Sequence, residues 1–210
     1  MFGIISATLK AVSGGTTAMS VPLCDFGLEE DRMADWNIAY NWMMEFEDPA
    51  RAYATVPDRC PAGCAGPCFA ISGVNSGVWP KEFATLKFLP QEMRGSGVEQ
   101  FYYKNFWNEW YAQLDSDEVA KRVFDMAVNG GPGTAVKILQ TAATHVSIFH
   151  DTLPAPTIDG KWGPQTVSCV NGLPNDEIVA AFQQARIAYY KAIPGVDPKI
   201  LAAWIARAEK

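Results

Sequence analysis

A glutamate at the end of an apolar helical segment is the residue of this sequence best suited to acid catalysis. Glu47 closes the segment 36–46, where apolar residues recur at helical spacing, and Pro49 disfavours helical geometry just beyond it. The carboxyl end of a helix carries partial negative charge, and Glu45 and Asp48 add acidic neighbours. We therefore expect Glu47 to hold its proton unusually tightly, as the proton donor in glycosidic bond cleavage must. The plainer interpretation is a helix end whose acids are solvated.

The connector that follows Glu47 supplies candidates for the rest of a catalytic site. Asp58 is the natural second carboxylate, and its distance from Glu47 decides between retaining and inverting hydrolysis. Ser72 and Asn75 lie in the segment 72–77, whose composition is first of all typical of a turn. We predict that these two polar side chains also bind substrate, by holding a water or sugar hydroxyls.

Aromatic side chains are concentrated in the segment 101–111, where they would wrap the whole surface of one helix. Because they cannot all enter a core, we expect some to line a groove, where an aromatic plane suits the apolar face of a sugar ring. We assign this substrate-binding role to Tyr102 and Trp107. Core packing is the simpler alternative for each of them taken alone.

Two polar residues share one face of a later helix. Asp125 and Asn129 are four residues apart and lie beside the apolar positions Phe124 and Val128. Such a pair usually belongs to a hydrogen-bond network that ties helices together. The alternative, which we include among the candidate substrate-binding residues, is that both support or line a cleft.

Helical periodicity dominates the chain, and the fold class is predicted to be mainly α, with at most one small hairpin in the connectors. A length of 210 residues fits one large domain or two small, closely packed ones. Start and stop signals predict helices over 31–47, 96–114, 117–129, 134–144, 176–193 and 198–208.

Composition excludes several classes of function. The net charge is −6 and the basic residues are scattered, so we expect no nucleic-acid partner. No segment approaches the roughly 18–20 apolar residues that span a bilayer, so we expect no stable membrane insertion. Residues 1–20 lack a charged region ahead of an apolar one and make no convincing signal peptide. We predict an N-terminal arm over 1–29, either mobile or bound to a partner.

Three of the five cysteines follow one another at a spacing of four. Cys60, Cys64 and Cys68 lie in a loop rich in Gly and Pro, and they can form one disulfide with a spare thiol, pair with Cys24 or Cys169, or hold a metal. Tetrahedral zinc needs a fourth ligand, and the usual paired short spacing is missing. We predict a structural role with no metal ligands and no cofactor, and keep a metal or redox module as the rival.

Taken in order, these segments resemble glycoside hydrolase family 108, the lysozyme-like N-acetylmuramidases of phages and bacteria. The closest likeness is 123–133, which nearly reproduces the family's Phe-Asp-x-x-Val-Asn-x-Gly-Pro signature. Segment 43–47 is similar to the family's apolar-apolar-x-His-Glu run, with Phe46 in place of the histidine. Segment 158–167 resembles the Asp-Gly-x-x-Gly-Pro-x-Thr turn of the associated peptidoglycan-binding module.

The resemblance implies a lysozyme-like helical fold with a catalytic region over 30–130 and a C-terminal helical peptidoglycan-binding region over 131–210. It implies hydrolysis of the β-1,4 bond between N-acetylmuramic acid and N-acetylglucosamine, with Glu47 as the general acid. An alignment shifted by two residues selects Glu45 instead. The implied partner is the peptidoglycan glycan strand, in a bacterial or phage protein that acts at the cell wall or periplasm. A secretion or phage-exit apparatus is a further partner under this interpretation.

One departure from the family pattern favours a rival function. Asp48 and Pro49 stand where the family has glycines, which let a sugar approach the backbone beside the acid. The rival is a non-catalytic peptidoglycan-binding or structural protein that keeps the fold without the chemistry.

Overall fold

The structure, a computed structural model, describes residues 33–210 except 62, 65, 108 and 151–153. The described residues belong to one compact unit, and they confirm the predicted mainly α class. The predicted arm over 1–29 lies outside the described residues. The predicted division between 30–130 and 131–210 stays a prediction. None of the helices in the described part of the chain is long and apolar enough to cross a membrane.

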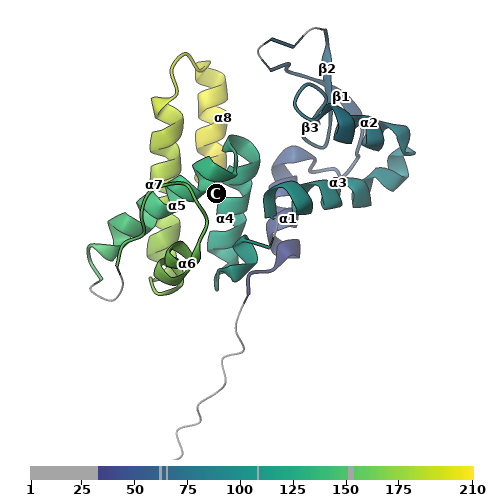
Figure 1. The fold of residues 1–210 in the computed structure, drawn as a ribbon. Helices are drawn as coiled ribbons and strands as arrows, with labels where there is room; N and C mark the ends of the chain where they lie inside the picture. The colour runs from purple at the N-terminus through teal and green to yellow at the C-terminus, as the bar shows by residue number, and fades with distance from the viewer. Residues whose placement is uncertain (1–32, 62, 65, 108, 151–153) are drawn as a thin grey trace, which may run out of the picture. The chain divides into compact units, whose positions relative to one another are not determined.

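Helices make up most of the described chain, and a small sheet follows the first of them (Figure 1). The α-helices are α1 (Trp36–Glu47), α2 (Pro80–Phe88), α3 (Arg94–Tyr102), α4 (Asp117–Gly130), α5 (Pro132–Ser147), α6 (Pro164–Asn171), α7 (Asn175–Ala192) and α8 (Pro198–Ala208). The short turns are η1 (Gln91–Met93), η2 (Tyr103–Trp107, a π-helix) and η3 (Tyr111–Gln113), and the strands are β1 (Thr55–Asp58), β2 (Cys68–Ile71) and β3 (Val74–Asn75).

Helix α4 is the centre of the core. It packs against α1 on one side and against α5 and α7 on another, and α7 in turn packs against α8 (Figure 1). Phe124 and Met126 of α4 are fully buried. Ser116 caps this helix as the sequence predicts, because its hydroxyl accepts a hydrogen bond from the Val119 N–H.

The sheet is antiparallel in the order β1-β2-β3. Ile71 pairs with Val74, so Ser72 and Gly73 form a two-residue hairpin loop. Both have positive φ, 45° and 83° respectively, as a type I′ turn requires. This tight turn fixes where the backbone of residues 72 and 73 lies relative to α1.

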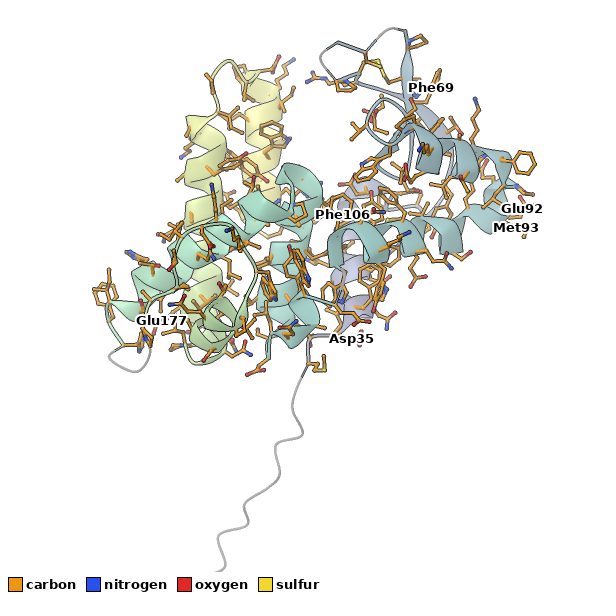
Figure 2. The ribbon with its side chains drawn as sticks, in the orientation of Figure 1. Asp35, Phe69, Glu92, Met93, Phe106 and Glu177 are labelled. Atoms are coloured by element: carbon orange, nitrogen blue, oxygen red, sulfur yellow. A yellow bond between two sulfur atoms is a disulfide. The ribbon has the colours of Figure 1, made fainter. Side chains whose placement is uncertain are left out.

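The predicted long helix over 96–114 is wrong in its continuity. Helix α3 ends at Tyr102, and the chain continues as the π-helix and then as η3. Phe106 and Trp107 of the π-helix are both buried. Figure 2 shows Phe106 among the side chains of this region.

Two helices form where the sequence analysis predicted none. Helices α2 and α6 both begin with a proline in the first turn, Pro80 and Pro164. Proline suits this position because its missing N–H has no helical partner there in any case. The predicted helix over 31–47 begins at Trp36, because the Asp35 carboxylate caps the Asn37 N–H.

Candidate functional site

Glu47 is the last residue of α1, which confirms the predicted end of that helix. Its position is fixed by the face of α1 that enters the core, where Met43 and Met44 are fully buried. The Asp48 N–H closes the final turn on the Met44 carbonyl at 3.0 Å. The Glu47 side chain is 19% exposed, while Glu45 is exposed to solvent. Of the two aligned acids, only Glu47 is held in a partly buried environment.

Asp48 organises the chain immediately after the candidate acid. Its carboxylate accepts hydrogen bonds from the Ala52 N–H at 3.0 Å, the Tyr53 N–H at 2.8 Å and the Ser72 hydroxyl at 2.7 Å. Burial acts to raise the pKa of Asp48, but these hydrogen bonds outweigh it and hold the pKa below its usual value. Asp48 is therefore an ionised anchor that ties the end of α1 to the β2–β3 turn.

The backbone of Gly73 passes directly beside the Glu47 carboxylate. A Cβ atom built at this position would lie 2.5 Å from Glu47 Oε2 and closer still to Tyr102 Oη. The Tyr102 hydroxyl itself donates to the Ser72 carbonyl at 2.8 Å and so supports the turn from beneath. Because Gly73 has no side chain, its backbone can lie this close to the carboxylate, and the residue itself is exposed on the surface.

Arg207 of α8 contacts the other oxygen of the candidate acid. Its Nη2 lies 2.9 Å from Glu47 Oε1, and its guanidinium carbon lies 4.6 Å from the centre of the Phe46 ring. The Arg207 side chain is only 13% exposed. A cation in this position, little screened by water, favours the ionised form of Glu47 and fixes the orientation of its carboxyl group.

The same arginine also binds Asp125, which is fully buried with 0% exposure. Arg207 Nε lies 3.0 Å from Asp125 Oδ1, and Arg186 Nη2 of α7 donates to Asp125 Oδ2 at 2.6 Å. Tyr190 extends this network, because it accepts from Arg186 Nε and donates to Asn129 Oδ1, both at 2.9 Å. The predicted hydrogen-bond network that ties helices together is confirmed, and it joins α4, α7 and α8.

Opposing influences set the protonation of Glu47. Burial raises its pKa, the charge and hydrogen bond of Arg207 lower it, and the charges of Asp125 and Asp58 raise it again. The net result is a pKa above the ordinary value for glutamate, in the direction that the sequence predicts. The causes differ from the predicted ones, because burial is foremost. Burial and then the Glu47 charge also raise the pKa of Tyr102, which therefore remains a neutral hydrogen-bond donor.

Asp58 lies at the end of β1 and is exposed. Asn75 Nδ2 donates to its Oδ2 at 2.6 Å and to the Arg59 carbonyl at 2.8 Å. Asn75 thus positions Asp58. Asp58 influences Glu47 through its charge, and that contribution is smaller than those of burial, Arg207 and Asp125.

The predicted stacking of Trp107 and Tyr102 on sugars is wrong in this structure. Trp107 is 1% exposed and packs edge-on against Trp36 and Phe124, and Tyr102 is 2% exposed. Rings buried to this extent have no face to offer a ligand, so core packing is the interpretation that holds. Tyr102 still reaches the site through its hydroxyl.

Three further predicted substrate-binding residues have roles within the protein. Asp125 is too buried to touch a substrate, so its assignment to direct binding is wrong, and it acts on the site only through Arg207. Ser72 is buried and donates its hydroxyl to Asp48. Asn129 is half-buried and accepts from Tyr190.

Arg207 and Gly73 are the site residues that sequence reasoning missed. A buried aspartate in an apolar helix signals that some cation must neutralise it. The partner is 82 residues away along the chain, and no local pattern identifies it. The composition of 72–77 indicated that Gly73 lies in a turn, but nothing in the sequence indicated that this turn lies next to Glu47.

A separate groove between α2 and α3 does not contain this site. It has a volume of about 460 Å³, and its lining includes Glu82, Leu86, Gln100 and Phe101. Glu82 is the only carboxylate in that lining, so the groove does not supply the paired acids of glycoside hydrolysis.

Comparisons with known proteins bear on the fold and on the class of function. The family model described as Glycosyl hydrolase 108 matches residues 71–131, less than a third of the chain. The matched part includes Gly73, Tyr102 and Asp125, while Glu47 precedes it and Arg207 follows it. The match supports a glycoside hydrolase type of function, and it leaves open which residue is the acid.

A solved structure extends the likeness to most of the described fold. The chain is similar to the structure of Brucella abortus SagA, with 20% identity and a TM-score of 0.54 over 83% of this chain and 93% of that chain. At this identity the likeness concerns the fold alone. No curated protein matches the chain.

Proposed function

We propose that this protein is a peptidoglycan hydrolase, an N-acetylmuramidase that cleaves the β-1,4 bond between N-acetylmuramic acid and N-acetylglucosamine. The observation that carries the proposal is the environment of Glu47, whose carboxyl group has a raised pKa and lies beside the exposed glycine edge at Gly73. Such a group keeps a proton at a pH where ordinary carboxylates have lost theirs, at a place where a sugar can reach it.

The two oxygens of the Glu47 carboxyl group have different neighbours and therefore different roles in the proposed acid catalysis. Arg207 holds Oε1, so Oε2 beside Gly73 is the oxygen from which the proton is donated to the leaving glycosidic oxygen. Burial favours the proton before transfer, and the guanidinium stabilises the negative charge that Glu47 acquires afterwards. Asp58 is the group for the second role, either activating the attacking water or holding an intermediate that water then hydrolyses.

The partners and location follow from this substrate. We infer that the chain acts on peptidoglycan glycan strands at the bacterial cell wall or periplasm, without a cofactor, and in concert with a secretion or phage-exit apparatus. We assign glycan binding outside the catalytic site to the region 131–210. This region also supplies Arg207, so removing it would disturb Glu47 as well as wall binding.

One observation favours a second candidate, a non-catalytic peptidoglycan-binding protein. The ion pair between Arg207 and Glu47 occupies one carboxyl oxygen and favours the ionised form, which is the wrong state for a proton donor. Protein that binds purified peptidoglycan but releases no reducing ends from it would support this candidate.

A wall-lysis assay on matched variants tests the proposal. Glu47→Gln keeps the size of the side chain and removes the transferable proton, so the rate should fall by about 10²–10⁴-fold, the usual contribution of a general acid. Glu45→Gln, at the exposed position two residues earlier, is the control and should lyse walls at the wild-type rate. Turbidity gives the rate, and mass analysis of the fragments identifies the bond cleaved. Near wild-type lysis by Glu47→Gln would refute the assignment.

A further inference from the structure

The loop between β1 and β2 brings three cysteine sulfurs together, apart from the candidate catalytic site. Cys60 and Cys68 form a disulfide, visible as a yellow bond in Figure 2. The Sγ of Cys64 lies 3.6 Å from that of Cys68, and all three sulfurs lie within 4.8 Å of one another. The Cys64 thiol remains outside the disulfide and is exposed.

The backbone explains why the three sulfurs converge. Cys68 begins β2 and pairs across the sheet with Asp58, so the two ends of the loop are held together by the strand register. Between them, Gly63 and Gly66 adopt φ of +84° and +99° and bend the chain around the sulfurs. The cluster is therefore part of the folded hairpin.

The geometry is close to that of a thiolate metal site. A metal–sulfur distance of about 2.3 Å in trigonal or tetrahedral coordination places sulfurs about 3.8–4.0 Å apart. The pair Cys64 and Cys68 is already near that spacing, and opening the disulfide gives Cys60 the same freedom. The sequence lacks the two separate short pairs of common zinc sites, but each three-residue interval is short enough for neighbouring sulfurs to reach one ion.

The set of donor atoms indicates which cations would bind. Within the described residues, the cluster contains sulfur ligands and no carboxylate or imidazole, a set that selects thiophilic ions over magnesium or calcium. Cys60 and Cys64 are exposed and Cys68 is buried, so an ion held here would lie at the rim of the loop. Water can then fill the fourth position that zinc requires.

We propose that Cys60, Cys64 and Cys68 form a site for one thiophilic divalent cation of the zinc class when their disulfide is reduced. A dithiol reductant supplies two electrons and two protons, breaks the sulfur–sulfur bond to give two thiols, and becomes a disulfide itself. The cation then binds the three sulfurs as thiolates and releases their protons to solvent. The disulfide and the bound cation are thus two alternative ways of cross-linking the same loop.

The loop that carries the three cysteines begins next to Asp58. The register pair Asp58 and Cys68 lies at the end of the hairpin, and Asn75 holds Asp58 from β3. A Cβ atom at Gly77 would lie 2.6 Å from Pro61 Cδ and 3.0 Å from Cys68 Sγ, so the loop packs closely on the segment after β3. In the disulfide form the loop therefore lies against the segment that follows β3, and it begins at the strand end that carries Asp58.

Zinc titration of the full chain tests the site directly. The background carries Cys24→Ser and Cys169→Ala, so that the three loop cysteines are the only thiols left. After reduction with dithiothreitol and its removal without oxygen, zinc chloride is titrated against a chromophoric chelator, and bound zinc is counted by elemental analysis. We expect one zinc per reduced chain and none for the oxidised chain.

The matched variant is Cys64→Ser, which keeps the disulfide pair but removes one ligand at an exposed position. Loss of a direct ligand should weaken zinc binding by more than the roughly 10–100-fold that changes around the ligands cause. Circular dichroism confirms that the variant is folded, and protection of the thiols from iodoacetamide by zinc gives a second measurement. Equal zinc affinity in the reduced and oxidised chains, or in Cys64→Ser and its parent, would overturn the proposal.

Discussion

Asp125 and Glu47 are two carboxyl groups that share one arginine, yet their surroundings differ. Asp125 is fully buried and is bound by both Arg186 and Arg207, so its charge is matched on each side. The Glu47 side chain is 19% exposed, has Arg207 as its one ion-pair partner among the described residues, and has a raised pKa. The first group holds three helices together through its two arginine partners, whereas the second has the raised pKa that a proton donor needs.

The two acids differ in their ion-pair partners and in their exposure to solvent. Both are carboxylic acids and both are largely buried, so neither residue type nor burial alone distinguishes the structural acid from the candidate catalytic one. A doubly paired carboxylate without solvent contact has no room for a substrate. Glu47 is 19% exposed and lies beside a residue without a side chain, so it is the better placed of the two to meet a substrate. We therefore expect substitutions around Asp125 to lower stability and substitutions around Glu47 to lower activity.

The largest expected loss of stability follows from Asp125→Asn. This change leaves two buried guanidinium groups without their common carboxylate, and breaking a buried pair typically costs about 3–5 kcal/mol. Urea unfolding followed by circular dichroism measures the change, with Glu45→Gln as an exposed control that should leave stability within about 0.5 kcal/mol. A loss below about 1 kcal/mol would contradict the structural role of Asp125.

Arg207→Gln should affect both acids, because Arg207 contacts both Asp125 and Glu47. Asp125 keeps Arg186, so we expect a smaller loss of about 2–3 kcal/mol than for Asp125→Asn. Arg207 lowers the pKa of Glu47, and without it that pKa should rise further. Because activity needs the protonated acid, the alkaline limb of the kcat/KM profile should move to higher pH.

The conservative variant Arg207→Lys is the control for this shift. It keeps a positive charge near Glu47, so its alkaline limb should lie between those of the wild type and Arg207→Gln. An unchanged or acid-shifted limb in Arg207→Gln, measured on soluble glycan fragments, would show that Arg207 does not act on the protonation of the catalytic acid.

Gly73→Ala should have an effect on chemistry beyond its effect on stability. Both Gly73 and Gly63 have positive φ, 83° and 84°, but an added Cβ at Gly63 meets nothing within 4 Å. Gly63→Ala therefore reports backbone strain alone, about 1 kcal/mol. Gly73→Ala carries the same strain and also displaces the Tyr102 hydroxyl and the Glu47 carboxyl group, so activity should fall by about 100-fold. Equal activity in the two alanine variants would argue against the glycine edge as the approach to the acid.

Local signals in the sequence were sufficient for much of the fold and for the main candidate acid. Ser116 and Asp197 mark the starts of α4 and α8 by capping, and Pro49 marks the end of α1 near Glu47. The break after Tyr102 was not predictable in the same way, because it answers the packing of rings on other helices.

The contacts around Glu47 were beyond local pattern reading. Arg207 is brought to the site by the packing of α7 and α8 on α4, and Gly73 by a turn whose position depends on strand register. Trp107 and Tyr102 were assigned to a groove because one helix could not bury all the aromatic residues, but both are buried, Tyr102 at the end of α3 and Trp107 in the π-helix. Both errors have the same source, since side chains distant in sequence decide which faces are covered.

The central claim is that Glu47 holds its proton above the ordinary range of glutamate, and its titration tests this most directly. Carboxyl carbon shifts of protein labelled with carbon-13 at glutamate, followed by NMR between acid and neutral pH, give the pKa of each group, and Glu47→Gln assigns the signal. We predict a Glu47 pKa clearly above the ordinary value of 4.5, raised again in Arg207→Gln. A pKa at or below that value in the wild type would contradict the account.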